Sequence, residues 1–186
     1  FAEDTPQIKE EQFFYRNCMK ELFDPKKFLI QGYKGTGKTY LYKALADKEI
    51  SANIQKWSGT QKQDLLEPIF VNILPTNEAS LVFDNIRYGA IDEPEYYFNT
   101  FWQIYTWNAL LLCPEFSSIK EQSELSEYVK PLDGAGYAKE ALIRIEDLIN
   151  KGVKSLIAIE KDMMLLNEFL QKEQKRLFVL YDRLDT

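Results

Sequence analysis

The segment FLIQGYKGTGKT, residues 28–39, is the most informative part of this 186-residue chain. It opens with an apolar run at Phe28–Ile30 and continues into a glycine-rich loop that begins at Gly32. After the loop, residues 38–47 favour a helix, because leucine and alanine recur there on one helical face. A short strand that passes through a glycine-rich loop into a helix predicts an α/β fold.

The loop fits the pattern G-x-x-x-x-G-K-[ST], which is typical of phosphate-binding loops. Its glycines allow the backbone to wrap around an anion with the N–H groups pointing inward, and the following helix adds the positive end of its dipole. In this pattern Lys38 reaches the β- and γ-phosphates of a nucleotide, and the Thr39 hydroxyl binds Mg²⁺. We expect nucleotide binding by Gly32, Tyr33, Lys34, Gly35, Thr36, Gly37, Lys38, Thr39 and Tyr40.

A second candidate functional motif lies near the other end of the sequence, where the apolar run Leu177–Tyr181 is followed by Asp182. A short apolar run without alternation is typical of a strand that is buried on both faces of a parallel sheet. A carboxylate at the end of such a strand would hold Mg²⁺ together with Thr39. Asp185 could act as general base on the attacking water, although a solvated carboxylate is nearly as good an interpretation. The catalytic candidates are therefore Lys38, Asp182 and Asp185.

Hydrophobic periodicity supplies the remaining elements. It predicts helices at residues 5–22, 94–113, 138–152 and 153–170, and one more buried strand at residues 69–74. Residues 50–59 are not assigned, and residues 80–86 form a strand or a loop. We expect a three-layer α/β P-loop architecture with a mainly parallel sheet and a helical insertion between the two motifs. The expected parts are an N-terminal helical segment at 1–24, a first core part at 25–93, the insertion at 94–175 and the last strand at 176–186.

Composition narrows the classes of function. Hydrophobic residues make up 45% of the chain and charged residues 28%, which is typical of a globular protein. The net charge of −6 gives no support for nucleic-acid binding, and no apolar run is long enough to span a membrane, so we expect a cytoplasmic protein. The chain has no histidine, which excludes histidine-based metal sites and triads, and Cys18 and Cys113 are expected to be free buried thiols.

The pair of motifs at Gly32–Thr39 and Leu177–Asp185 resembles the Walker A and Walker B motifs of the additional-strand class of P-loop ATPases. Within that class it is most similar to bacterial ATPases of the STAND and KAP kind. The resemblance implies Mg²⁺-dependent ATP hydrolysis, self-association through the ATPase domain and a regulatory, signalling or defence role. Thr186 stands where many relatives carry Glu, and the sensor strand and arginine finger expected after this point are missing from the sequence. Because the chain also begins without Met, we expect it to be part of a longer protein.

Other nucleotide-dependent functions remain as alternatives. A GTPase would carry an N-K-x-D motif, and Asn150-Lys151-Gly152-Val153 fails at its last position. A small-molecule kinase would use an arginine-rich lid, whereas the arginines of this chain are scattered. A nucleotide-binding sensor or scaffold without turnover would fit a chain with one clear acid at the site.

Overall fold

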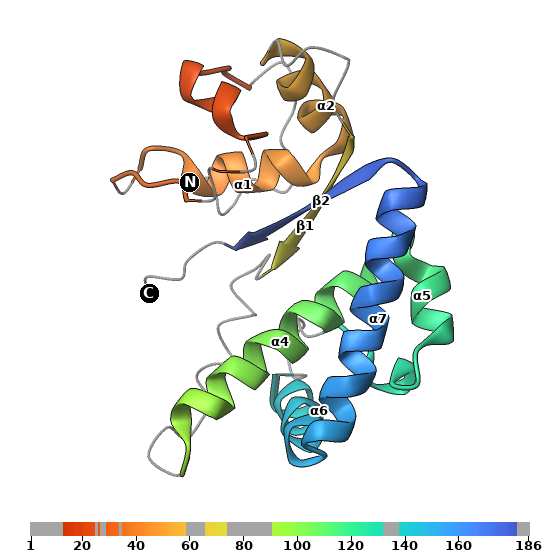
Figure 1. Cartoon of the computed structure of the whole chain (residues 1–186). Helices are drawn as coiled ribbons and strands as arrows, with labels where there is room; N and C mark the ends of the chain where they lie inside the picture. Colours follow the sequence, from red (N-terminus) through yellow and green to blue (C-terminus); the bar gives the residue numbers. More distant parts are fainter. Residues whose placement is uncertain are drawn as a thin grey trace. The chain divides into compact units, whose positions relative to one another are not determined.

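The computed structural model describes residues 13–24, 26, 29–33, 35–58, 66–73, 91–131 and 138–181. The chain divides into two compact units, the first made of residues 1–72 with 174–186 and the second of residues 73–173. The described elements are mostly helices together with a small parallel sheet of two strands (Figure 1). The mixed α/β class expected from the sequence is therefore confirmed.

The first unit carries the sheet and the helices that cover it. Its elements are the 3-10 helix η2 (Asn17–Glu21), the helices α1 (Lys38–Ala46) and α2 (Lys48–Trp57), and the strands β1 (Glu67–Ile73) and β2 (Lys175–Tyr181). The side chains of β1 alternate, so that Ile69, Val71 and Ile73 are buried. Both strands confirm sequence predictions. The expectation that the second would be buried on both faces is wrong, because β2 is partly exposed along its length in a described sheet of only two strands.

A single residue joins the two helices of this unit. Asp47 ends α1 and caps α2, where its carboxylate accepts hydrogen bonds from the backbone N–H groups of Glu49 and Ile50, each at 3.0 Å. The capped helix buries Ile50 and Ile54, which are four residues apart and therefore share one face. The sequence had left this segment unassigned.

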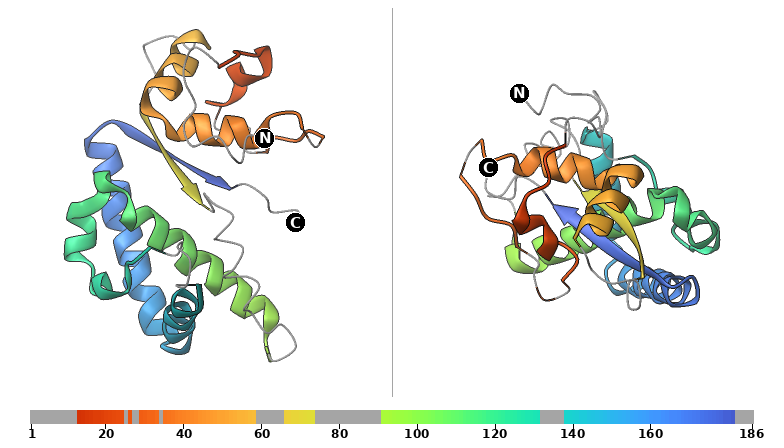
Figure 2. Two further views of the ribbon diagram at one scale, coloured as in Figure 1. Left: turned by 180° about the vertical axis from the view of Figure 1, so that it is seen from behind. Right: turned by 90° about the horizontal axis from the view of Figure 1, so that it is seen from above.

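Aromatic packing attaches the helices to the sheet. Phe23, which follows η2, makes edge contacts with Phe70 of β1 and Phe178 of β2, at centroid distances of 6.1 and 6.0 Å. Those two rings stack on each other at 5.0 Å. In addition, the Asn72 side chain donates a hydrogen bond to the Tyr42 carbonyl at 3.2 Å. Figures 1 and 2 show η2, α1 and α2 on the same face of the two strands.

Two predicted elements of the first unit differ from the structure. Leu29 and Ile30 form no strand, and their side chains are 68% and 51% exposed. A strand needs partners for its backbone N–H and C=O groups, and the described sheet contains only β1 and β2. The helix expected over residues 5–22 is reduced, among the described residues, to η2, because Arg16 has an extended backbone (φ −118°, ψ 146°) that begins it. The segment 80–86 lies outside the described residues.

The second unit is helical. It contains α4 (Pro94–Leu112), η5 (Pro114–Phe116), α5 (Ser117–Gln122), η6 (Ser126–Tyr128), α6 (Ala138–Asn150) and α7 (Val153–Lys172). Three of these helices, α4, α6 and α7, confirm predictions from periodicity. Among the aromatic residues of α4, Phe101, Tyr105 and Trp107 are buried and form part of the core. The turn between α6 and α7 contains Gly152, whose positive φ of 59° favours glycine.

A buried carboxylate holds three parts of this helical unit together. Asp162 of α7 is 2% exposed and accepts hydrogen bonds from the indole N–H of Trp107 at 2.9 Å and from the Ser123 hydroxyl at 2.6 Å. Trp107 belongs to α4, and Ser123 lies directly after α5. Because a buried carboxylate is stable only when its lone pairs are satisfied, this network fixes the relative position of the three helices.

Candidate functional site

The glycine-rich loop leads directly into the N-terminus of α1. Gly35 and Gly37 have positive φ values of 84° and 88°, a conformation that side chains disfavour. Gly37 is the N-cap of α1, and no side chain caps the helix there. The first backbone N–H groups of a helix have no partner within it, so this end of α1 offers donors and the positive end of a dipole to an anion.

Three donors from the loop and the start of α1 converge on two carbonyl groups. The backbone N–H and the hydroxyl of Thr36 both donate to the Tyr33 carbonyl, at 3.2 and 2.9 Å. The Lys38 ammonium group donates to the Gly32 carbonyl at 2.6 Å and reaches the Tyr33 carbonyl at 3.4 Å. The only described contacts of this cation are therefore backbone carbonyls of its own loop. A carbonyl is a weaker partner for an ammonium group than a phosphate, so an entering anion can displace it.

Gly32 lies where the two sides of the loop approach closely. A Cβ atom at this position would come within 2.6 Å of the Thr36 hydroxyl oxygen, which is closer than atoms in contact can lie. The glycine thus belongs to the loop for a steric reason, in addition to its place in the motif.

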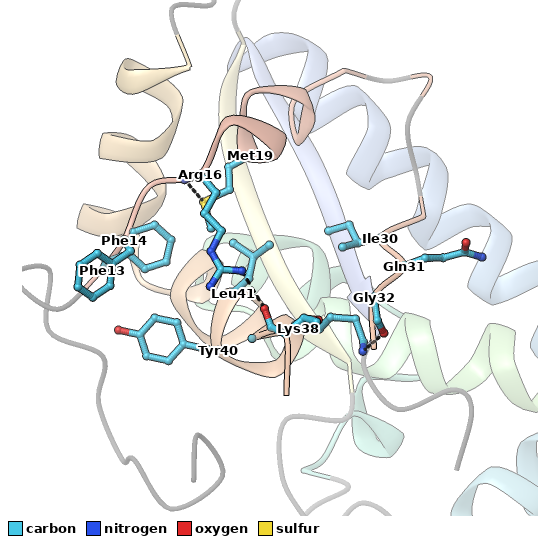
Figure 3. A pocket seen from close by; sticks show the side chains of 12 residues that line it. Phe13, Phe14, Arg16, Met19, Ile30, Gln31, Gly32, Lys38, Tyr40 and Leu41 are labelled. Atoms are coloured by element: carbon cyan, nitrogen blue, oxygen red, sulfur yellow. Dashed lines mark hydrogen bonds between the residues drawn. The ribbon is translucent and has the colours of Figure 1, made fainter. Parts of the chain in front are cut away.

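A pocket of about 330 Å³ opens beside the loop (Figure 3). It is lined by residues from three segments, namely the chain before and within η2, the chain from Ile30 through the loop, and the first turns of α1: Phe13, Phe14, Arg16, Met19, Ile30, Gln31, Gly32, Thr36, Gly37, Lys38, Tyr40 and Leu41. Two of these side chains are cations and none of them is acidic, although the chain as a whole has a net charge of −6. The pocket therefore combines a positive region with largely apolar walls.

Aromatic side chains form one part of the wall. The rings of Phe13 and Tyr40 are stacked with their centroids 5.9 Å apart and an angle of 10° between their planes. Phe14 also lines the pocket, although 80% of its surface is exposed. Figure 3 shows these three rings together at one side of the pocket, with Gly32 and Lys38 toward the other. Apolar and aromatic walls of this kind suit a planar organic group, such as a nucleobase.

The structure brings part of the predicted set together. Of the nucleotide-binding candidates, the pocket is lined by Gly32, Thr36, Gly37, Lys38 and Tyr40. Three more lie on the same segment without lining it: Tyr33, which is 90% exposed, Gly35, and Thr39 in the first turn of α1. Lys34, Asp182 and Asp185 lie outside the described residues, although β2 ends at the residue directly before Asp182.

The residues before the loop were missed by the sequence analysis. Phe13, Phe14, Arg16 and Met19 line the pocket, whereas the periodicity predicted only a helix over residues 5–22. The available signal was the adjacent aromatic pair followed closely by an arginine, ahead of a phosphate-loop pattern. Its meaning depends on the extended backbone at Arg16, which periodicity alone does not reveal.

Two properties of the described residues bear on the class of site. Within these ranges, no three His, Cys, Asp or Glu side chains are grouped so that they could hold a metal ion. None of the helices that the structure describes is long and apolar enough to cross a membrane. Comparisons of the chain with protein-family models, with curated proteins and with solved structures found no match.

Proposed function

We propose that this chain binds a nucleoside triphosphate, ATP in the first place, and hydrolyses it with Mg²⁺. The observation that carries the proposal is the position of Lys38, which lies at a glycine-rich loop and lines a pocket that holds two cations and no acid. An uncapped helix N-terminus adds donors for the phosphates at the same place. The stacked pair of Phe13 and Tyr40 supports binding of the base beside them.

The pocket fits such a ligand in size and chemistry. A volume of about 330 Å³ lies at the lower end of the range of about 300–1,000 Å³ that is common for ligand sites. Mg²⁺ prefers oxygen ligands, and Thr39 with Asp182 would supply them, so that the metal would neutralise charge on the phosphates. Asp185 would orient the attacking water in this proposal. The motifs also favour a three-layer P-loop fold for the first unit.

The test is calorimetric titration of Mg-ATP, Mg-GTP and pyrophosphate into the purified chain and into Lys38→Ala. Removing the ammonium group takes away one charge-assisted hydrogen bond, which contributes about 1.5–3 kcal/mol, so the affinity for pyrophosphate should fall about 10- to 100-fold. Lys56→Gln is the matched control, since Lys56 is an exposed cation of α2 that does not line the pocket.

The outcomes separate the alternatives. Binding of ATP with release of phosphate supports an ATPase, whereas binding without release supports a sensor or scaffold. Preference for GTP would overturn the choice of adenine. If pyrophosphate and both nucleotides bind equally well to the parent chain and Lys38→Ala, the loop is not the site and the proposal fails.

A further inference from the structure

Arg16 contacts the loop from outside the motif. It lies directly before η2, where its backbone is extended and its N–H group points to the Met19 sulfur at 3.4 Å. From this position the guanidinium group donates a hydrogen bond from Nη1 to the Thr36 carbonyl at 3.1 Å. Figure 3 shows the side chain reaching across the pocket from η2 toward the start of α1. Thr36, one position before Gly37, thus holds the guanidinium group at the loop.

Most of the donor capacity of this group is unused within the residues that the structure describes. A guanidinium group has five N–H donors, and the Thr36 carbonyl is the one acceptor that it has in the described part of the chain. No described carboxylate pairs with Arg16 or with Lys38, and both line the same pocket. Each of the two cations is held by a loop carbonyl, and both lie next to an uncapped helix N-terminus. Together they form a site for more than one negative charge.

We propose that Arg16 is a second phosphate-binding side chain of this site and acts together with Lys38. This inference rests on the proposed function. One N–H group stays on the Thr36 carbonyl and orients the fork, while other N–H groups bind phosphate oxygens. The site therefore selects ligands that carry at least two linked phosphates, because a single phosphate cannot reach both cations as effectively. Binding of the ligand also links the segment around η2 to the loop.

Titration of inorganic pyrophosphate against the parent chain, Arg16→Gln, Arg16→Lys and the control Lys56→Gln tests this inference. Loss of a charge-assisted contact should weaken pyrophosphate binding about 10- to 100-fold in Arg16→Gln. Arg16→Lys should recover part of the loss, because it keeps the charge without the planar fork. Lys56→Gln should stay within about twofold of the parent chain, since exposed charges at a distance are screened by salt.

Salt dependence distinguishes contact with the ligand from support of the loop. If Arg16 binds phosphate, the affinity in Arg16→Gln should depend less steeply on salt concentration, while Arg16→Lys should keep the parental dependence. An unchanged salt dependence in Arg16→Gln would assign the residue to loop structure alone and overturn the inference. Near-ultraviolet circular dichroism of both variants checks that they are folded.

The result for Lys38→Ala separates this inference from the proposed function. If Lys38→Ala loses pyrophosphate while Arg16→Gln binds it as tightly as the parent chain does, the second cation is not part of the site, although the proposed function stands. If the parent chain binds neither pyrophosphate nor ATP, the proposed function fails and this inference fails with it.

Discussion

Substitution of Gly32 by alanine tests the geometry of the loop directly. The new Cβ atom would lie 2.6 Å from the Thr36 hydroxyl oxygen, so one side of the loop must move. If the Thr36 side chain rotates away, its 2.9 Å hydrogen bond to the Tyr33 carbonyl is lost, at a cost of about 0.5–1.5 kcal/mol. If the backbone moves instead, overpacking costs about 1–3 kcal/mol. Gly32→Ala should therefore weaken pyrophosphate binding about 2- to 150-fold.

A double-mutant cycle shows whether this contact is the cause. Without the Thr36 hydroxyl, the nearest described atom to the new Cβ is Thr36 Cβ at 3.5 Å, which is an ordinary contact. The double variant Gly32→Ala/Thr36→Ala should thus bind pyrophosphate about as well as Thr36→Ala alone, as measured by calorimetry. Fully additive losses would refute the steric argument, because they would mean that the two positions do not interact.

Gly35→Ala is the matched control for this cycle. Apart from its chain neighbours, no described residue has an atom within 4 Å of a Cβ built on Gly35, whose φ is 84°, so the expected cost is that of the left-handed backbone, about 1–2 kcal/mol. Thr36→Ala should not relieve that cost. Rescue of Gly35→Ala by the same second substitution would show that Thr36→Ala acts through general loosening of the loop.

Two further predictions concern the acid after β2 and the helical unit. Asp182→Asn should keep the affinity for ATP within about threefold but reduce phosphate release about tenfold or more. The reason is that a metal-holding carboxylate is lost while the loop stays intact. If this variant releases phosphate at the parental rate, Asp182 is not part of the site. Asp162→Ala should lower the free energy of unfolding by about 3 kcal/mol in chemical denaturation, because the buried donors of Trp107 and Ser123 lose their acceptor. Glu124→Gln, at an exposed ion pair with Lys161, should have a far smaller effect, and equal losses would contradict the role given to the buried network.

Long periodic segments were predictable from the sequence, since their pattern reports directly on which face is buried. The helices at α4, α6 and α7 and the strand β1 follow from such patterns. α2 was missed because it follows α1 with only Asp47 between them, so one residue both ends a helix and begins the next. Leu29 and Ile30 show the reverse error, since an apolar run becomes a strand only where another strand satisfies its backbone.

The loop half of the site was predictable, and the half contributed by the preceding segment was not. The motif identifies Gly32, Gly37 and Lys38 because each of these positions needs a particular residue type, either for the local backbone conformation or for its charge. Phe13 and Arg16 reach the same pocket through the extended chain before η2, a tertiary arrangement without local periodicity. The relation of Asp182 to the loop stays a prediction.

The central claim is that the loop ending at Lys38 and the acid that follows β2 act on one triphosphate. A crystal structure with Mg²⁺ and a non-hydrolysable ATP analogue measures this directly. We expect the Lys38 ammonium group to leave the Gly32 carbonyl for the phosphates, with Asp182 at the metal or one water molecule away. A complex in which the nucleotide lies elsewhere, or in which Asp182 is remote from the metal, would contradict the claim.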